Sequence, residues 1–232
     1  MTATTNSPGR AGGRAPSAGT PCPEGAITAL EPDPRRAASV RIYVAGKPYY
    51  TISREAAAGA GLAIGRAIDP ALHEQLGRAA DAEAAFRTAV GAIGLRGYAR
   101  ADLGRRLVRR GHPREAVAEA LERADALGLL DDAAYAREYV QTRAARGRGP
   151  VRLQRDLLSM GVARADIDRA IAAHWPEGTE DLEMPLALAR RRAVQLGGLA
   201  PPVRRRRLLA YLARRGFTGR AAMTAVTRAL EG

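Results

Sequence analysis

One spacing pattern occurs three times in this chain of 232 residues and limits the fold more than any other feature. In each copy, two leucines four residues apart are followed after four residues by a glycine, and then by two apolar residues that are again four apart. Residues four apart share one face of a helix, and a glycine commonly ends a helix in the left-handed conformation. Each copy therefore predicts two helices joined at a glycine. The copies occupy residues 103–121, 153–171 and 208–226, with their glycines at Gly111, Gly161 and Gly216.

A further helical segment precedes each copy, so the pattern predicts tandem three-helix repeats. Composition agrees, because only 4% of the residues are aromatic and alanine supplies much of the 46% hydrophobic fraction. Alanine favours helices over strands. We expect a mainly α protein whose three repeats stack into an elongated, curved array. The expected domains are repeat 1 over 81–128, repeat 2 over 129–176, and a linker with repeat 3 over 177–232.

The N-terminal residues differ from the repeats. Residues 1–38 are rich in Gly, Pro, Ala, Ser and Thr, which predicts a disordered tail that can be deleted, for example over residues 1–34, without loss of stability. Residues 39–80 contain β-branched and aromatic runs on both sides of a Gly-Lys-Pro turn, followed by helical periodicity. This pattern predicts a small β-hairpin followed by a helical element. Asp69 and Pro70 mark the start of a helix.

The charge of the chain points to an acidic partner. Lys and Arg number 37 against 24 Asp and Glu, a net charge of +13, and Lys47 is the single lysine. Arginine suits bidentate contacts to phosphate and carboxylate, so nucleic acid or an acidic protein surface is the expected partner. The chain has one cysteine, no apolar run long enough for a membrane span, and no apolar signal segment at its start. We expect a soluble, cytoplasmic protein with no membrane partner.

Two motifs in repeat 2 resemble a known family. Residues 128–136 read Gly-Leu-Leu-Asp-Asp-Ala-Ala-Tyr-Ala, and residues 146–150 read Arg-Gly-Arg-Gly-Pro. Together they resemble RecX, the bacterial regulator of the RecA recombinase. The resemblance extends from about Arg41 to the C-terminus and is weakest in the third repeat.

The resemblance implies three tandem three-helix repeats and a regulator of homologous recombination, DNA repair and the SOS response. It implies binding to the RecA filament, with single-stranded DNA contacted weakly or through the recombinase. It also implies suppression of ATP hydrolysis and strand exchange, and promotion of filament disassembly. We expect a monomer.

The motif residues themselves favour structural roles. Asp131 and Asp132 precede a helix and are expected to cap it, and Tyr135 is expected to contact the core. Pro150 is expected at the first position of the next helix, after a turn shaped by two glycines. The family-motif residues with predicted structural roles are Leu130, Asp131, Asp132, Tyr135, Gly147, Gly149, Pro150, Gly111, Gly161 and Gly216.

The candidate binding residues are arginines. If Leu208 and Leu212 are buried, helical geometry places Arg206, Arg207 and Arg214 outward, whereas Arg204, Arg205 and Arg215 flank the core. The corresponding helices of repeats 1 and 2 also have outward arginines, and three more lie beside the Gly-Arg-Gly-Pro turn. The candidates for contact with the partner or DNA are Arg105, Arg109, Arg143, Arg146, Arg148, Arg152, Arg155, Arg206, Arg207 and Arg214.

No catalytic arrangement is evident. His73, His112 and His174 lie in separate elements without a cysteine or carboxylate at ligand spacing. We therefore expect no enzymatic activity, no cofactor and no metal.

Two alternatives remain. Each helix–glycine–helix pair resembles a helix-turn-helix motif, but the second helices of repeats 1 and 2 contain carboxylates, including Glu119 and Asp166, that DNA phosphates would repel. The other alternative is a helical scaffold with no nucleic-acid role, whose arginine excess reflects only the codon bias of a GC-rich genome.

Overall fold

The computed structural model describes residues 21–176 and 182–231, which form two compact units. One unit contains the residues up to Ala92 together with Arg106–Leu127, and the other contains Ile93–Arg105 and the residues from Gly128 onward. Within the described part of the chain, no helix is long and apolar enough to cross a membrane.

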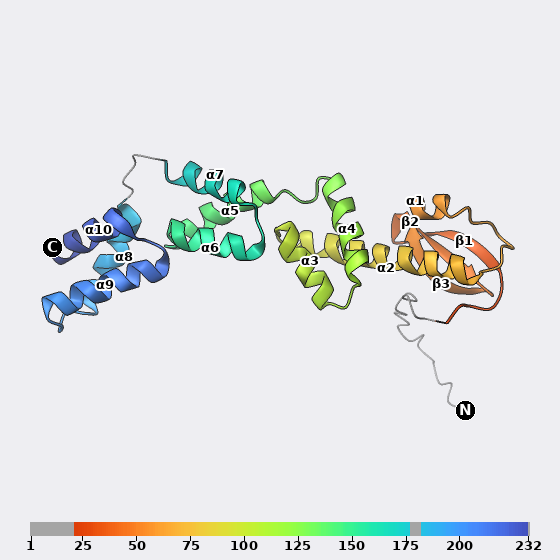
Figure 1. Ribbon diagram of the computed structural model, residues 1–232, viewed down its shortest axis with the longest axis horizontal. Helices are drawn as coiled ribbons and strands as arrows, with labels where there is room; N and C mark the ends of the chain where they lie inside the picture. The colour runs from red at the N-terminus through yellow and green to blue at the C-terminus, as the bar shows by residue number, and fades with distance from the viewer. Residues whose placement is uncertain (1–20, 177–181, 232) are drawn as a thin grey trace, which may run out of the picture. The chain divides into compact units, whose positions relative to one another are not determined.

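The first unit begins with an antiparallel sheet of strand order β1-β2-β3. The strands are β1 (Ile27–Asp33), β2 (Arg36–Val44) and β3 (Lys47–Ser53) (Figure 1). Strands β2 and β3 are the predicted hairpin. The two residues between them, Ala45 and Gly46, both have positive φ, at 48° and 74°. Two-residue hairpin turns commonly require this geometry, because it matches the twist of the strands.

Strand β1 contradicts the predicted tail over residues 1–38. Ile27 pairs with Val44 and is only 1% exposed, and β2 itself already begins at Arg36. The averaged composition of the segment hid the apolar Ile27 and Leu30, which pack on the core between the sheet and the following helix. Residues 1–20 of the predicted tail lie outside the described residues.

The position of β1 changes the expected outcome of truncation. Deleting residues 1–20 should leave the melting temperature nearly unchanged, because the hydrogen bond from the Tyr49 hydroxyl to the Pro21 carbonyl and the strand itself are kept. Deleting residues 1–34 removes β1 and exposes the core beneath Ile27, so the melting temperature should fall clearly. Thermal unfolding of both truncated proteins checks this. Equal melting temperatures would show that β1 adds no stability.

Two helices follow the sheet in this unit, α1 (Arg54–Gly59) and α2 (Pro70–Ile93). The Asp69 carboxylate accepts a hydrogen bond from the Leu72 amide at 2.8 Å, which confirms the predicted start of α2. Side chains of the sheet and of α2, among them Ile42, Ile52 and Leu76, form one core. The predicted domain boundary between residues 80 and 81 is wrong. It falls inside α2, because residues 78–90 contain no proline or glycine that would end the helix.

A buried carboxylate ties the sheet to the helices of this unit. Glu83 is 3% exposed and accepts hydrogen bonds from the Ser39 hydroxyl at 2.6 Å and from Arg123 Nη1 at 2.8 Å. A buried charge needs such partners, since desolvation otherwise costs several kcal/mol.

The remaining helices follow the predicted repeats. They are α3 (Arg100–Arg109), α4 (Arg114–Ala126), α5 (Asp132–Ala144), α6 (Pro150–Met160), α7 (Arg164–His174), α8 (Glu183–Val194), α9 (Pro201–Arg215) and α10 (Gly219–Glu231). The six leucines of the repeat pattern are all 0% exposed, and the three glycines after them have φ near +90°. The mainly α fold with three-helix repeats is thus confirmed. The arrangement of the repeats as one curved array stays a prediction.

Repeats 2 and 3 each have a core of their own. The core of repeat 2 joins α5, α6 and α7 through residues such as Val140, Leu157 and Ile167. The core of repeat 3 joins α8, α9 and α10 through Leu212, Val226 and their neighbours. Much of each core is alanine, which allows the helices to approach closely. The predicted linker begins at residue 177, and its residues 177–181 lie outside the described residues.

Candidate functional site

The two aspartates of the first motif cap two different helices. The Asp131 carboxylate accepts a hydrogen bond from the Ala134 amide at 2.8 Å and caps α5, as predicted. The Asp132 carboxylate instead accepts from the Arg100 amide at 2.8 Å, at the first residue of α3. The predicted capping role is therefore correct for Asp131, whereas Asp132 caps a helix of the preceding repeat.

The tyrosines of α5 pack beside these caps. Tyr135 is half-buried against the core of repeat 2, and its hydroxyl donates to the Met160 sulfur at 3.3 Å. Its neighbour Tyr139 packs on the same core. Burial is the main reason why the pKa of both phenols is raised above the ordinary value. Leu130 is half-buried before α5 begins. The predicted core contact of Tyr135 is confirmed.

The Gly-Arg-Gly-Pro turn joins repeat 2 to repeat 3. Pro150 opens α6, as predicted, and the amides of Gly149 and Val151 donate to the Arg215 and Gly216 carbonyls at 2.7 and 3.3 Å. The backbones approach so closely that a Cβ on Gly149 would lie 2.5 Å from the Gly216 carbonyl carbon. The start of α6 therefore receives the carbonyl groups at the end of α9, and only glycine fits on both sides.

A related contact joins the end of α6 to the start of α3. A Cβ on Gly161 would lie 2.5 Å from the Cβ of Ala101. Nearby, Arg105 Nη2 donates to the Ser159 carbonyl at 2.9 Å and forms an ion pair with Asp102 at 3.3 Å. By contrast, nothing lies within 4 Å of a Cβ on Gly111 among the described residues.

Several candidate arginines are held by a carboxylate or a ring. Asp156 binds Arg148 Nη1 at 2.6 Å and Arg152 Nε at 2.9 Å, and the guanidinium of Arg143 lies 5.4 Å from the centre of the Tyr139 ring. These contacts order the side chains beside the turn and partly neutralise their charge.

The outward arginines of the repeats are exposed, as predicted. Arg105 and Arg152 form the ion pairs given above, whereas no ion-pair partner of the others occurs among the described residues. Arg204 and Arg215 are half-buried beside Leu208 and Leu212, but Arg205 is exposed, so its predicted place beside the core is wrong. The buried side chains of α9 lie on one narrow face of the helix, which includes the position of Arg204 but not that of Arg205. The candidate arginines without an ion-pair partner among the described residues are Arg109, Arg146, Arg155, Arg206, Arg207 and Arg214.

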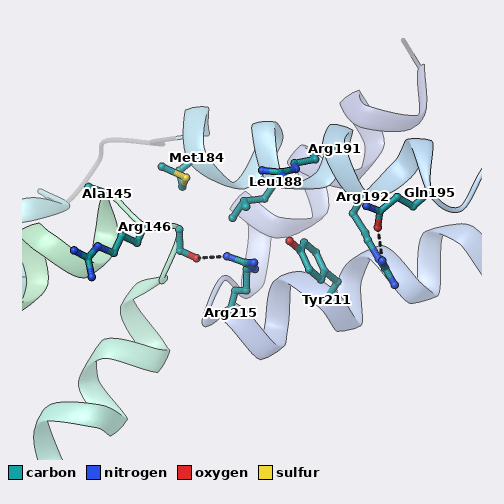
Figure 2. Close-up of a pocket in the computed structure, with 10 residues that line it drawn as sticks. Ala145, Arg146, Met184, Leu188, Arg191, Arg192, Gln195, Tyr211 and Arg215 are labelled. Carbon is teal, nitrogen blue, oxygen red and sulfur yellow. Dashed lines mark hydrogen bonds between the residues drawn. The ribbon is translucent and has the colours of Figure 1, made fainter.

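A basic cleft of about 530 Å³ lies where the end of α5 meets α8 and α9. Its arginines are Arg146, Arg191, Arg192 and Arg215, and no acidic residue lines it among the described residues. Figure 2 shows Arg192 and Arg215 on either side of Tyr211. Their guanidinium carbons lie 5.8 and 5.1 Å from the centre of the ring. Arg215 donates to the Gly147 carbonyl at 3.5 Å, and Arg192 donates to the Gln195 side chain. Met184 and Leu188 provide the apolar part of the cleft (Figure 2).

Of the predicted binding residues, only Arg146 lines this cleft; Gly147 and Arg215, which also line it, were predicted in structural positions. The run of three arginines at 190–192 was a usable signal, but a single helix cannot show which of its arginines meets another helix. Tyr211 and Arg215 become part of the cleft only through the packing of α9 beside α8 and the turn. In the described part of the chain, no group of His, Cys, Asp and Glu is placed to hold a metal ion.

Comparison with known proteins places these repeats in a family. Two family models, described as the second and third three-helix domains of RecX, match residues 131–171 and 179–226. The regulatory protein RecX of Halorhodospira halophila is 36% identical over 143 residues, which cover 60% of this chain and 84% of that protein. The chain belongs to the RecX family.

A RecX from Pseudomonas syringae pv. tomato is 35% identical over 99 residues, covering 41% of this chain. The chain spans 64% of the length of that relative. The crystal structure of a regulatory protein RecX superposes with a TM-score of 0.72 at 21% identity, over 89% of this chain and 99% of the solved one. The likeness to this solved structure concerns the fold alone.

The matches to RecX domains locate the features described above. The match to the second domain begins at Asp131, the cap of α5, and contains the Gly-Arg-Gly-Pro turn. The match to the third domain contains α8, α9 and Gly216. The basic cleft thus lies between residues of the second and third RecX domains.

Proposed function

We propose that this chain regulates the RecA recombinase without being an enzyme itself, by binding the RecA filament on single-stranded DNA. Binding suppresses ATP hydrolysis and strand exchange and promotes disassembly of the filament. The observation that supports this most strongly is membership of the RecX family, whose relatives are named regulatory proteins. The chain acts as a monomer in the cytoplasm, where the filament forms.

The surface of the repeats supports an acidic partner. Exposed arginines that have no ion pair with any described residue occur on α6 and α9, where Arg155, Arg206 and Arg207 keep their charge available for phosphate or carboxylate groups. Guanidinium groups bind both kinds of anion in bidentate geometry. The filament presents both, through DNA phosphates and acidic side chains of the recombinase.

The helix-turn-helix alternative is less well supported. In repeat 2, the second helix of the helix–glycine–helix pair is α7. It contains Asp166 and Asp168, which are bound to Arg169 and Arg164 of the same helix at 2.5 and 2.9 Å. These arginines are therefore neutralised within the helix that would have to enter the major groove. A sequence-specific footprint on duplex DNA would favour this alternative over the filament.

The direct test is the ATPase activity of the cognate recombinase on single-stranded DNA, titrated with this protein. We expect the hydrolysis rate to fall as the protein is added, and to approach a minimum when the filament is saturated. Adding the protein before or after filament assembly separates inhibited growth from disassembly. An unchanged or increased rate at saturation would contradict the proposed function.

A further inference from the structure

The basic cleft between α5, α8 and α9 has the features of a binding site rather than of a solvated surface. Its volume of about 530 Å³ lies in the range of pockets that enclose a small molecule or one unit of a polymer. Four guanidinium groups line it without an acidic residue among the described ones. Like charges gathered in a concave site repel one another, so the cleft favours an anionic ligand.

We propose that this cleft binds a nucleotide unit of single-stranded nucleic acid, with its phosphate on the arginines and its base against Tyr211. The cleft would act within the proposed function and depends on it, because the DNA-bound filament provides the single strand. The inference concerns this chain alone, and no contact with the recombinase is needed for the cleft to be occupied.

The combination of ring and charge favours a nucleotide over an acidic peptide. Arg192 and Arg215 lie on either side of the half-buried ring of Tyr211, which brings two cations next to an aromatic surface. Single-stranded nucleic acids are held in this way, by bases stacked on aromatic rings beside cations that track the phosphates. Leu188 and Met184 provide apolar surface for the sugar or base.

The strand must be single, because the bases of a duplex are already stacked on one another. A phosphate alone would use the guanidinium groups but leave the apolar side chains of Met184 and Leu188 without a contact. The nucleotide unit is the ligand chemistry that uses the arginines, the ring and the apolar side chains together.

Helix α8 offers a matched pair of variants. Arg192 lines the cleft, whereas Arg190 is exposed on the same helix, two residues away and roughly 200° around the axis. Arg192→Ala and Arg190→Ala remove the same charge from neighbouring positions. Tyr211→Leu and Tyr211→Phe form a second pair, in which only the first removes the ring.

The experiment measures the affinity of the full-length protein for a fluorescent oligothymidylate by anisotropy at several salt concentrations. We expect Arg192→Ala to weaken binding several-fold and to reduce the slope of log affinity against log salt by about 0.7, the value for one phosphate contact on a single strand. Arg190→Ala should leave the slope unchanged. Tyr211→Leu should weaken binding several-fold, and Tyr211→Phe should restore it. Melting temperatures separate these effects from unfolding.

Three results would overturn the proposal: no binding of the parent protein, equal effects of Arg190→Ala and Arg192→Ala in a folded protein, or a Tyr211→Leu variant that binds like the parent. A fourth is an Arg192→Ala variant whose affinity for polyglutamate falls while its affinity for oligothymidylate does not. That result would assign the cleft to an acidic polypeptide. Because the recombinase is absent from these measurements, their failure is distinguishable from a failure of ATPase inhibition.

Discussion

Replacing Gly216 by alanine should destabilise the protein by about 3 kcal/mol or more. Two costs add at this position. Its φ of +94° strains any residue with a Cβ, and that Cβ would lie 2.4 Å from the backbone nitrogen of Arg152. Because backbone atoms cannot turn aside as a side chain can, α6 and α9 would have to separate. Urea unfolding followed by far-UV circular dichroism measures the loss as a lower midpoint.

Alanine substitutions at two other glycines measure the cost of the positive φ and the cost of the close backbone contact separately. Gly111 has a φ of +90° with nothing within 4 Å of its Cβ position among the described residues, so Gly111→Ala should cost only about 1 kcal/mol. Gly149 has an ordinary φ of −84°, but its Cβ would lie 2.5 Å from Gly216, so Gly149→Ala tests the close approach alone. If Gly216→Ala is no more damaging than Gly111→Ala, the close backbone contact is not present in solution.

Reversing two charges on α9 should have the largest effect on function. Arg206→Glu combined with Arg207→Glu should weaken binding to the RecA filament about tenfold or more, which corresponds to about 1.4 kcal/mol. Both side chains are exposed without an ion-pair partner among the described residues, so the melting temperature should stay nearly unchanged. Filament affinity at two salt concentrations and inhibition of ATP hydrolysis measure the effect, since electrostatic contacts weaken with salt.

The matched control reverses two exposed arginines elsewhere in the same unit. Arg137 on α5 and Arg190 on α8 have no ion-pair partner among the described residues. Arg137→Glu with Arg190→Glu makes the same change in net charge. Equal losses in both double variants would mean that only the total charge matters and that α9 is not a binding surface.

The repeat architecture could be predicted from the sequence because it depends on local geometry. Leu153 and Leu157 share a helix face, and Gly161 follows at the position where the helix must end. Both requirements concern neighbouring residues and are visible in the spacing. The cap at Asp131 was predictable for the same reason.

Features that depend on distant residues were not predictable. Strand β1 is stable because it bonds to β2 and buries Ile27 under α2, and its own composition resembles that of a disordered segment. Asp132 could be recognised as a cap but not assigned to α3, whose first amide lies 32 residues earlier. Likewise, Tyr211 and Arg192 become neighbours only through the packing of α8 and α9.

The junction between α9 and α6 couples the stability of the second and third repeats. The amides of Gly149 and Val151 depend on the carbonyls of Arg215 and Gly216, while the first turn of α9 begins at Pro201 without a side-chain cap from any described residue. Loss of either repeat would therefore expose backbone groups of the other to water, which solvates amides and carbonyls alike. Each repeat has a core of its own, so the junction adds stability that repeats 2 and 3 possess only as a pair.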